Sequence, residues 1–427
     1  MSPITTGLQI TDPSADIRDE IAAASGVPEM PNKIWFQKTA AGVIDADRCV
    51  GCGSCIAACP SQSIGIGEDG RPTLIRMCTG CSACWDYCPM AGLRTERLAL
   101  DVSQERAELA GEPNATEAGT GSLPLLGRVV DSFSAQAVDR AAGAQDGGVV
   151  TALLAELLRA GYIDGVIMNQ RLDALHGRPV LATTPEEVAA CAGSVYHQAN
   201  LLASLNDRLP KGVERIALVG TPCQISGVSA LQRFPWHYRE TAAGAVVLKI
   251  ALFCTRSFDP ELLGPAIAAE GVELDQVSKV DVRAGEMIAQ DDDGGELMRV
   301  PVREMRDAAL KGCLECTDYT GLVADLSVGS VGSEPGWTTV LVRSDEGREA
   351  LEKGSAALQV LPGPDMALVE KSAAADLRRA GKVLARGYDA DGGLWVSYTS
   401  HLRDYADTDR SAASPPPFRS QHYEVNC

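Results

Sequence analysis

The chain has 427 residues, a net charge of −19, a pI near 4.7 and a hydrophobic fraction of 45%. This composition indicates a globular protein of two or three domains, and its acidity argues against nucleic-acid binding, which needs a positive field. No run of about 20 apolar residues predicts a membrane span, and the first residues lack the basic start and apolar stretch of a secretory signal, so we expect a cytoplasmic protein.

Three segments precede the main domain. Residues 1–40 are predicted to be an N-terminal extension with one short helix over residues 16–26. A cysteine-rich block follows at residues 41–98. Residues 99–126 are polar, acidic and rich in Gly, Pro and Thr, which is typical of an exposed linker.

Residues 127–388 show alternating strand and helix patterns. Short apolar runs bounded by turn residues predict buried strands, and a glycine-flanked apolar stretch at 147–161 predicts a helix. The remaining expectations are strands at 162–169, 215–220, 246–254, 324–333 and 337–344, and helices at 346–358 and 373–387. The fold class is therefore α+β, a small head followed by a larger α/β domain. Residues 389–427 are expected to be a tail.

Fourteen cysteines in a chain without a signal peptide are more typical of metal or redox ligands than of disulfides. Eight of them form two identical runs with the spacing C-x2-C-x2-C-x3-C-P. The first run is Cys49, Cys52, Cys55 and Cys59, and the second is Cys78, Cys81, Cys84 and Cys88.

This spacing predicts two [4Fe–4S] clusters, because three close thiolates surround one cluster and the fourth reaches the other cluster. One cluster would use Cys49, Cys52, Cys55 and Cys88, and the other Cys78, Cys81, Cys84 and Cys59. A zinc ribbon or a disulfide framework is the alternative, although structural zinc sites lack the x3-C-P ending. The head is similar to the bacterial two-cluster ferredoxin module, so it indicates electron transfer without naming a substrate.

Four further cysteines lie in short segments that are next to a glycine turn or at the end of a predicted strand. They are Cys223, Cys254, Cys313 and Cys316. They could converge as the ligands of a third [4Fe–4S] cluster. A cysteine is also a common small buried hydrophobic residue, and spacing alone leaves both readings open.

Five strings in order, DGGVVTALLAELL, CAGSVYHQA, GTPCQISG, LFCTRSF and CLECTDYTGLVADLSVGSVGSEPGWTTVLVR, resemble the coenzyme F420 hydrogenase/dehydrogenase beta-subunit family over about residues 127–388. The resemblance implies a non-covalent FAD in this domain and a [4Fe–4S] cluster on the four later cysteines. It also implies hydride exchange with coenzyme F420 and electron transfer with a redox partner protein or catalytic subunit. Homo-oligomer formation is left open.

The candidate cofactor-binding residues are turn and helix-start residues, for which plain turn architecture is the alternative. Gly147, Gly148 and Thr151 would present a helix start to the flavin pyrophosphate, unless Asp146 simply caps that helix. The other candidates are Gly193, Ser194, Tyr196, Gly220, Thr221, Gln224 and Lys311. Asp146 stands where the family usually has Ser, and Val195 where Lys is common, so a cation for an anionic coenzyme would have to come from arginines elsewhere.

Two other functions compete with an F420-linked flavoprotein. The same cofactors could serve a ferredoxin-dependent reductase of a tetrapyrrole-like substrate. A non-catalytic electron-transfer subunit with an empty flavin site is the third possibility. Hydrolase and kinase motifs are missing from the sequence.

Overall fold

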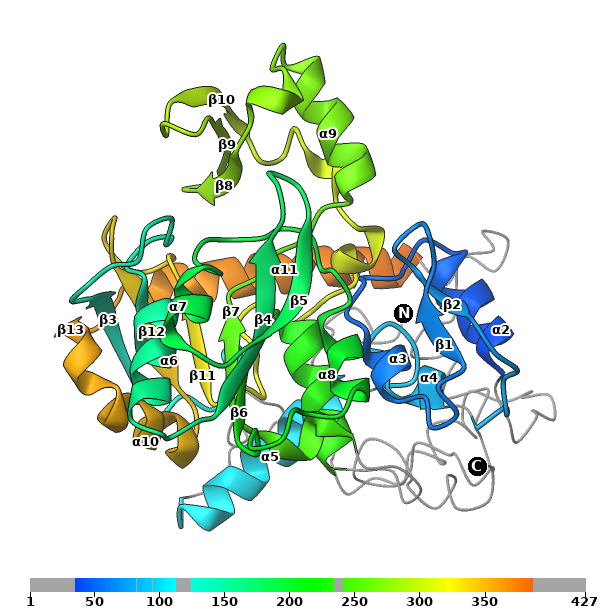
Figure 1. Cartoon of the computed structure of the whole chain (residues 1–427), viewed down its shortest axis with the longest axis horizontal. Coiled ribbons are helices and arrows are strands. Elements are labelled where there is room, and N and C mark those ends of the chain that lie inside the picture. Colours follow the sequence, from blue (N-terminus) through cyan, green and yellow to red (C-terminus); the bar gives the residue numbers. More distant parts are fainter. Residues whose placement is uncertain (1–34, 82, 94, 113–123, 234–240, 387–427) are drawn as a thin grey trace.

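The computed structural model describes residues 35–81, 83–93, 95–112, 124–233 and 241–386. They form a cysteine-rich head, an eight-stranded mixed sheet covered by helices, and a small three-stranded sheet that projects from the body (Figure 1). The α+β class expected from the sequence is confirmed. None of the described helices is both long enough and apolar enough to span a membrane.

The head is built from short elements. They are α2 (Phe36–Thr39), the π-helical η2 (Ala40–Ile44), α3 (Ser54–Ala57), β1 (Ile64–Ile66), β2 (Pro72–Leu74) and α4 (Ala83–Asp86), with β1 and β2 antiparallel. Phe36 and Thr39 are buried in the head, so the extension expected up to residue 40 is wrong from Phe36 onward. The helix expected over residues 16–26 lies outside the described residues.

The large sheet has the strand order β13-β3-β12-β11-β7-β6-β4-β5. Its members are β3 (Asp131–Ala137), β4 (Gly165–Arg171), β5 (Gly177–Ala182), β6 (Ile216–Gly220), β7 (Val246–Leu252), β11 (Leu326–Gly329), β12 (Thr338–Val342) and β13 (Leu358–Leu361). Strands β4, β6, β7 and β11 are parallel neighbours, and the other pairs are antiparallel. Because β3 pairs antiparallel with β12, and β12 with β11, β3 also runs in the direction of the parallel group. The carboxyl ends of these five strands therefore meet at one edge, where ligands bind in open α/β sheets.

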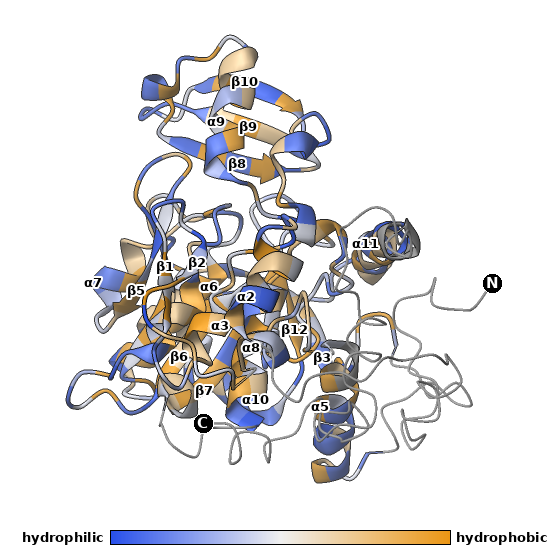
Figure 2. Cartoon of the chain, turned by 90° about the vertical axis from the view of Figure 1, so that its right-hand side faces the viewer, coloured by the Kyte–Doolittle hydropathy of each residue, from blue (hydrophilic) through white to orange (hydrophobic). Residues whose placement is uncertain are grey.

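Helices cover both faces of this sheet. They are α6 (Val149–Arg159), α7 (Pro185–Ala189), α8 (Pro222–Arg233) and α10 (Asp345–Lys353). In helix α11 (Met366–Arg386), Val369 and Ala373 pack with Leu126 and Tyr319 in a separate apolar cluster. The strands expected from the sequence and the helix at 147–161 are confirmed within a few residues. The helix expected at 346–358 ends earlier, at Lys353, and the helix expected at 373–387 begins earlier, at Met366. Along β6 the buried side chains alternate, as Ile216 and Leu218 face the α8 side while Ala217 and Val219 face the α6 side. This alternation explains why both faces of β6 are apolar. Figure 2 shows apolar residues along β6 and α3.

The small sheet was not expected from the sequence. It consists of β8 (Lys279–Arg283), β9 (Glu286–Gln290) and β10 (Glu296–Pro301), all antiparallel, and packs with α9 (Pro260–Ala269) around a separate apolar cluster. In Figures 1 and 2 it stands above the body. Charged residues such as Lys279, Asp281 and Arg299 interrupt the apolar positions of these strands, so the sequence shows no clear strand pattern here.

The expected linker is wrong for residues 99–109. They belong to helix α5 (Thr95–Leu109), in which Leu98, Leu100 and Val102 are buried. These side chains share one apolar cluster with Ala57 and Tyr87 of the head and with residues of α8 and β6. The head and the body therefore have a common hydrophobic core.

Candidate metal and flavin sites

The two cysteine runs of the head have the same local structure. Gly51 and Gly80, each two residues after the first cysteine of its run, have positive φ angles of 64° and 70°. Their N–H groups point to the sulfurs of Cys49 (3.5 Å) and Cys78 (3.3 Å). Glycine is needed at such positions because it adopts positive φ without strain. Backbone donors of this kind tune the potential of an iron–sulfur cluster.

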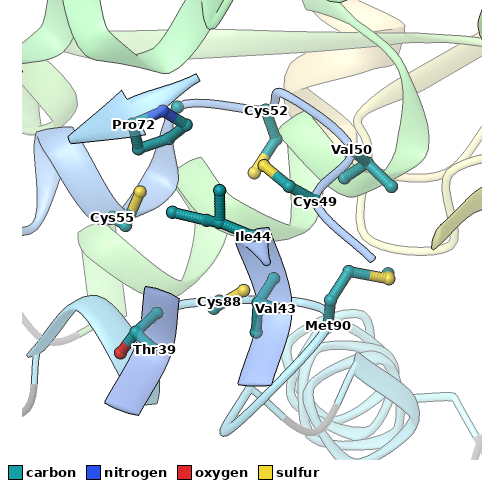
Figure 3. A pocket seen from close by; sticks show the side chains of 11 residues that line it. Thr39, Val43, Ile44, Cys49, Val50, Cys52, Cys55, Pro72, Cys88 and Met90 are labelled. Atoms are coloured by element: carbon teal, nitrogen blue, oxygen red, sulfur yellow. The ribbon is translucent and has the colours of Figure 1, made fainter. Parts of the chain in front are cut away.

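The first cysteine group surrounds a cavity in the head (Figure 3). Its lining includes Cys49, Cys52, Cys55 and Cys88, with Ile44 among them and other apolar residues around. Three members come from the first run and the fourth from the second run, which is the grouping that the spacing predicted. No disulfide joins the cysteines of the described residues.

Burial disfavours the thiolate form in this cavity. It raises the pKa of Cys49 to about 11, and it raises the pKa values of Cys55 and Cys88 well above the usual range, with the like charge of neighbouring cysteines adding to the effect. Thiolates are the form that binds metal, so they become favourable here once cations stand beside them. The four cysteines of the first group therefore suit a cationic iron centre, which would stabilise their thiolate form.

The second group lies beside the first. Burial raises the pKa of Cys84, and the like charges of Cys81, Cys78 and Cys59 raise it further. The hydroxyl of Thr39 in α2 is 3.2 Å from Cys84 Sγ. This group again combines three cysteines of one run with the last cysteine of the other run.

The third group gathers at the carboxyl edge of the large sheet. Cys223 stands in the first turn of α8, directly after β6, and Cys254 follows the neighbouring strand β7. Cys313 lies in the 3-10 helix η7 (Lys311–Leu314), and Cys316 follows it. Burial is the largest cause that raises the pKa of Cys254, followed by the like charges of Cys313 and Cys316. The structure thus brings together four cysteines from three distant segments.

No group of three or more His, Cys, Asp or Glu side chains in the described part of the chain is placed to hold a metal ion. A [4Fe–4S] cluster spaces its thiolate sulfurs more widely than a single ion does, since each sulfur binds a different iron. The cavity of the first group, with four cysteines around it, therefore suits a [4Fe–4S] cluster better than a single metal ion.

The predicted flavin residues at the start of α6 have defined structural roles. Gly148 is the N-cap of α6, with a φ of 68° and no side-chain cap, so the alternative that Asp146 caps this helix is wrong. A Cβ on Gly147 would stand 2.5 Å from the carbonyl oxygen of Ala135, so β3 can approach only a glycine here. Thr151 is buried in the first turn of α6.

The loop that contains Gly193, Ser194 and Tyr196 packs against the loop before α6. Ser194 donates a hydrogen bond to the Gln145 side chain, and Gly193 has a φ of 108°. The hydroxyl of Tyr196 accepts the N–H of Val282 in β8 (2.8 Å). These contacts bring two of the predicted flavin loops together, and they occupy the Tyr196 hydroxyl with the small sheet.

The remaining candidates serve the protein's own architecture. Gln224 Oε1 accepts the N–H of Thr221 (2.9 Å), and its Nε2 donates to a backbone carbonyl (3.2 Å). A Cβ on Gly220 would stand 2.7 Å from that Oε1. Lys311 forms an ion pair with Asp47 of the head (2.5 Å), and its side chain is 67% exposed. Gln224 and Lys311 therefore have partners within the protein, which argues against a flavin contact for either.

Sequence reasoning missed two residues at the carboxyl end of β4. Arg171 Nη1 and Asn169 Oδ1 are buried and have no hydrogen-bond partner in the described part of the chain. Arg171 Nη1 lies 3.3 Å from the position that a Cβ on Gly193 would take. Unsatisfied buried polar atoms are costly and call for a ligand or other explanation. The signal was available, because an arginine that ends a buried parallel strand lies at the ligand-binding edge.

Comparison with known proteins identifies similarity along most of this architecture. Residues 132–206 and 213–362 match the N-terminal and C-terminal parts of the coenzyme F420 hydrogenase/dehydrogenase beta subunit, and residues 42–94 match a 4Fe-4S dicluster domain. The coenzyme F420 hydrogenase subunit beta of Methanothermobacter thermautotrophicus is 32% identical, over 61% of this chain and 96% of that protein. A component of the F(420)H(2) dehydrogenase of Methanosarcina mazei is 27% identical, over 80% of this chain and 91% of that protein.

A solved structure shares the fold. A chain in a structure of the F420-reducing [NiFe] hydrogenase complex from Methanosarcina barkeri aligns with a TM-score of 0.57 and 29% sequence identity. The alignment covers 62% of this chain and 94% of that chain.

Proposed function

Because the chain belongs to the coenzyme F420 hydrogenase/dehydrogenase beta-subunit family, we propose that it exchanges hydride between coenzyme F420 and a bound FAD, with single electrons passing through three [4Fe–4S] clusters to or from a redox partner. The chain is an oxidoreductase, as its relatives' names indicate. FAD would supply the conversion between hydride transfer and one-electron transfer, because a deazaflavin carries hydride and an iron–sulfur cluster carries one electron.

The cysteine groups have separate parts in this proposal. The first and second groups would hold the two clusters of the head, and the third group would hold a cluster at the carboxyl edge of the sheet. The protein keeps these sites apolar and buried, and it supplies backbone N–H donors such as that of Gly51 to the sulfurs. Both features set how readily a cluster is reduced.

The flavin and the coenzyme would occupy the same edge, between the start of α6 and the end of β4. Gly148 places the start of α6 there, and Arg171 and Asn169 offer unsatisfied polar atoms. Arg171 would hold a phosphate or carboxylate of the flavin or of the coenzyme, since a guanidinium pairs well with either anion. It would thereby supply the cation that is missing at Val195.

One observation supports the proposal above all others. The third cysteine group and the candidate flavin loops lie at one edge of the sheet, and Cys223 and Cys313 share an apolar cluster with Cys52 and Cys88 of the head. Hydride chemistry at this edge would therefore have an iron–sulfur site beside it and a second one close behind.

The test is anaerobic purification followed by titration with reduced coenzyme F420. We expect about twelve iron atoms per chain, four for each cluster, one FAD, and loss of flavin and then of cluster absorbance during the titration. Failure of reduced F420 to reduce the protein at any concentration would refute the F420 reaction. Full iron content without FAD would instead identify a non-catalytic electron-transfer subunit.

Cysteine variants test the third cluster. Cys254→Ala should lower the iron content by about four atoms and leave the head clusters in place. Cys191→Ala is the matched control, because Cys191 is a buried cysteine that packs in the apolar cluster on the α6 face, away from the three groups. Equal iron content in the two variants would show that Cys254 is not a ligand.

A further inference from the structure

We propose that the contact between residues 47–52 of the head and residues 311–316 of the body sets the distance between the first and third cysteine groups, with Gly312 as the positioning residue. This inference rests on the proposed function for its electron-transfer meaning. It fixes an order in which the first group connects the third group to the second group, which then lies at the far end of the head.

Gly312 lies directly against the head backbone. A Cβ on Gly312 would stand under 3.0 Å from the carbonyl oxygen of Arg48 and 2.8 Å from Cγ1 of Val50. Gly312 is absent from the residues with positive φ, so its backbone conformation alone would accept another residue. The close approach of the two segments is therefore what requires glycine.

The head backbone cannot easily yield at this point. The N–H of Arg48 bonds to the carbonyl of Val43 (2.7 Å). Its guanidinium donates to both carboxylate oxygens of Glu315 (2.8 and 2.6 Å) and to the carbonyl of Gly42 (3.1 Å). The Arg48 and Glu315 side chains are only 6% and 10% exposed. An arginine–carboxylate ion pair with two hydrogen bonds fixes the relative orientation of the two segments as well as the distance between them.

The same contact joins the cysteine groups. Val50, Cys52 and Cys88 of the head pack in one apolar cluster with Cys313 and Cys223 of the body.

The second group has a different neighbour. Cys59, Cys78 and Cys84 share one apolar cluster with Cys49 and Cys55 of the first group. None of the four second-group cysteines belongs to the apolar cluster that contains Cys223 and Cys313. The order of the groups is therefore second, first, third.

Electron transfer between clusters slows steeply with distance. A side chain at position 312 should therefore slow electron transfer between the first and third clusters while all their cysteine ligands stay in place. We expect Gly312→Ala to keep its iron and FAD, and to slow reduction of the head clusters by reduced F420 about tenfold or more, since misplacement of reacting groups by about 1 Å costs up to about 10²-fold. Reduction of the flavin itself should change less than about twofold, because the flavin edge is untouched.

A second readout does not depend on the reaction. In protein reduced chemically with dithionite, the magnetic interaction between the first and third clusters, seen as broadening of the electron paramagnetic resonance signals, should weaken in Gly312→Ala. Gly244→Ala is the matched control, because Gly244 has no atoms near its Cβ position and no positive φ. Because dithionite replaces F420, failure of the proposed coenzyme chemistry would not affect this measurement.

Unchanged head reduction and unchanged spin interaction in Gly312→Ala with full iron would overturn the inference. If that variant cannot be recovered with full iron, Glu315→Gln decides in its place, since it keeps the side-chain shape and weakens the ion pair with Arg48. Weaker spin interaction in Glu315→Gln would support the inference, and an interaction equal to that of the parent protein would refute it.

Discussion

Arg171 should be an anion-binding residue rather than a structural one, and Arg171→Met separates the two roles. The side chain ends β4 at the edge where the flavin loops meet, and its Nη1 has no partner in the described part of the chain. A hydrogen bond to a charged group contributes about 1.5–3 kcal/mol. Removal of one such bond to a phosphate or carboxylate should weaken binding by about 10- to 150-fold, at 1.4 kcal/mol for each factor of ten.

The stability of the apoprotein should respond in the opposite direction. A buried nitrogen without a hydrogen-bond partner is costly, so Arg171→Met should leave the urea-unfolding free energy of the flavin-free protein unchanged or raise it by about 1–2 kcal/mol. A structural arginine would lower that free energy when it is replaced. Arg171→Met should therefore lower ligand affinity without lowering apoprotein stability only if Arg171 binds a ligand.

The assay is titration of flavin-free protein with FAD, and of FAD-loaded protein with F420, by fluorescence quenching. Arg178→Met is the matched control, because Arg178 on β5 is exposed and donates to the Gln170 side chain (3.1 and 2.8 Å). Loss of FAD affinity would assign Arg171 to the flavin, and loss of F420 affinity alone would assign it to the coenzyme. Parent-like affinity for both molecules would refute the reasoning.

Three further predictions concern stability. Arg343→Met should lower the free energy of unfolding by about 3–5 kcal/mol in urea, because the wild-type guanidinium is fully buried and bonded to two side-chain hydroxyls and two backbone carbonyls. Gly227→Ala should cost about 1–3 kcal/mol in the same assay, since its Cβ would stand under 3.0 Å from the buried Ser54 hydroxyl; a parent-like midpoint would show that α8 and the head tolerate separation. Burial lowers the pKa of His197, whose Nδ1 faces the N–H of Gly177, so its contribution to stability is present above pH 6.5 and is lost as pH falls through the lower folded-state pKa. Thermal unfolding midpoints should therefore fall between pH 7.5 and about 5.5, and His197→Gln should flatten that dependence.

The cysteine groups of the head could be predicted from sequence because their spacing is local. Three cysteines within seven residues are close enough in sequence to bind the same cluster. The repeat of the pattern then indicates that the fourth ligand of each cluster is the last cysteine of the other run. The third group needed the fold as well. Cys223 and Cys254 come together because β6 and β7 are adjacent parallel strands, and a single sequence does not state which strands are neighbours.

The errors have a common cause, which is that polar composition was taken as exposure. Helix α5 lies in an acidic stretch, yet Leu98 and Leu100 form a buried face on it. In the small sheet, Val280 is buried between Lys279 and Asp281, and Met298 is buried next to Arg299. The flavin contact of Lys311 stays a prediction, and its ion-pair partner Asp47 could not be foreseen because it is 264 residues away in sequence.

The common hydrophobic core of head and body has a consequence for how the protein folds and is handled. Ala57 and Tyr87 of the head belong to the same core as α5 and α8, so neither part can lose its packing alone. We expect a single cooperative unfolding transition rather than two. Expression of residues 41–98 by themselves would expose the apolar surface that α5 and α8 now cover, and the excised fragment should aggregate or fail to keep its iron. The cysteine repeat marks a unit of sequence, whereas the unit of stability joins the head to α5, α8 and the large sheet.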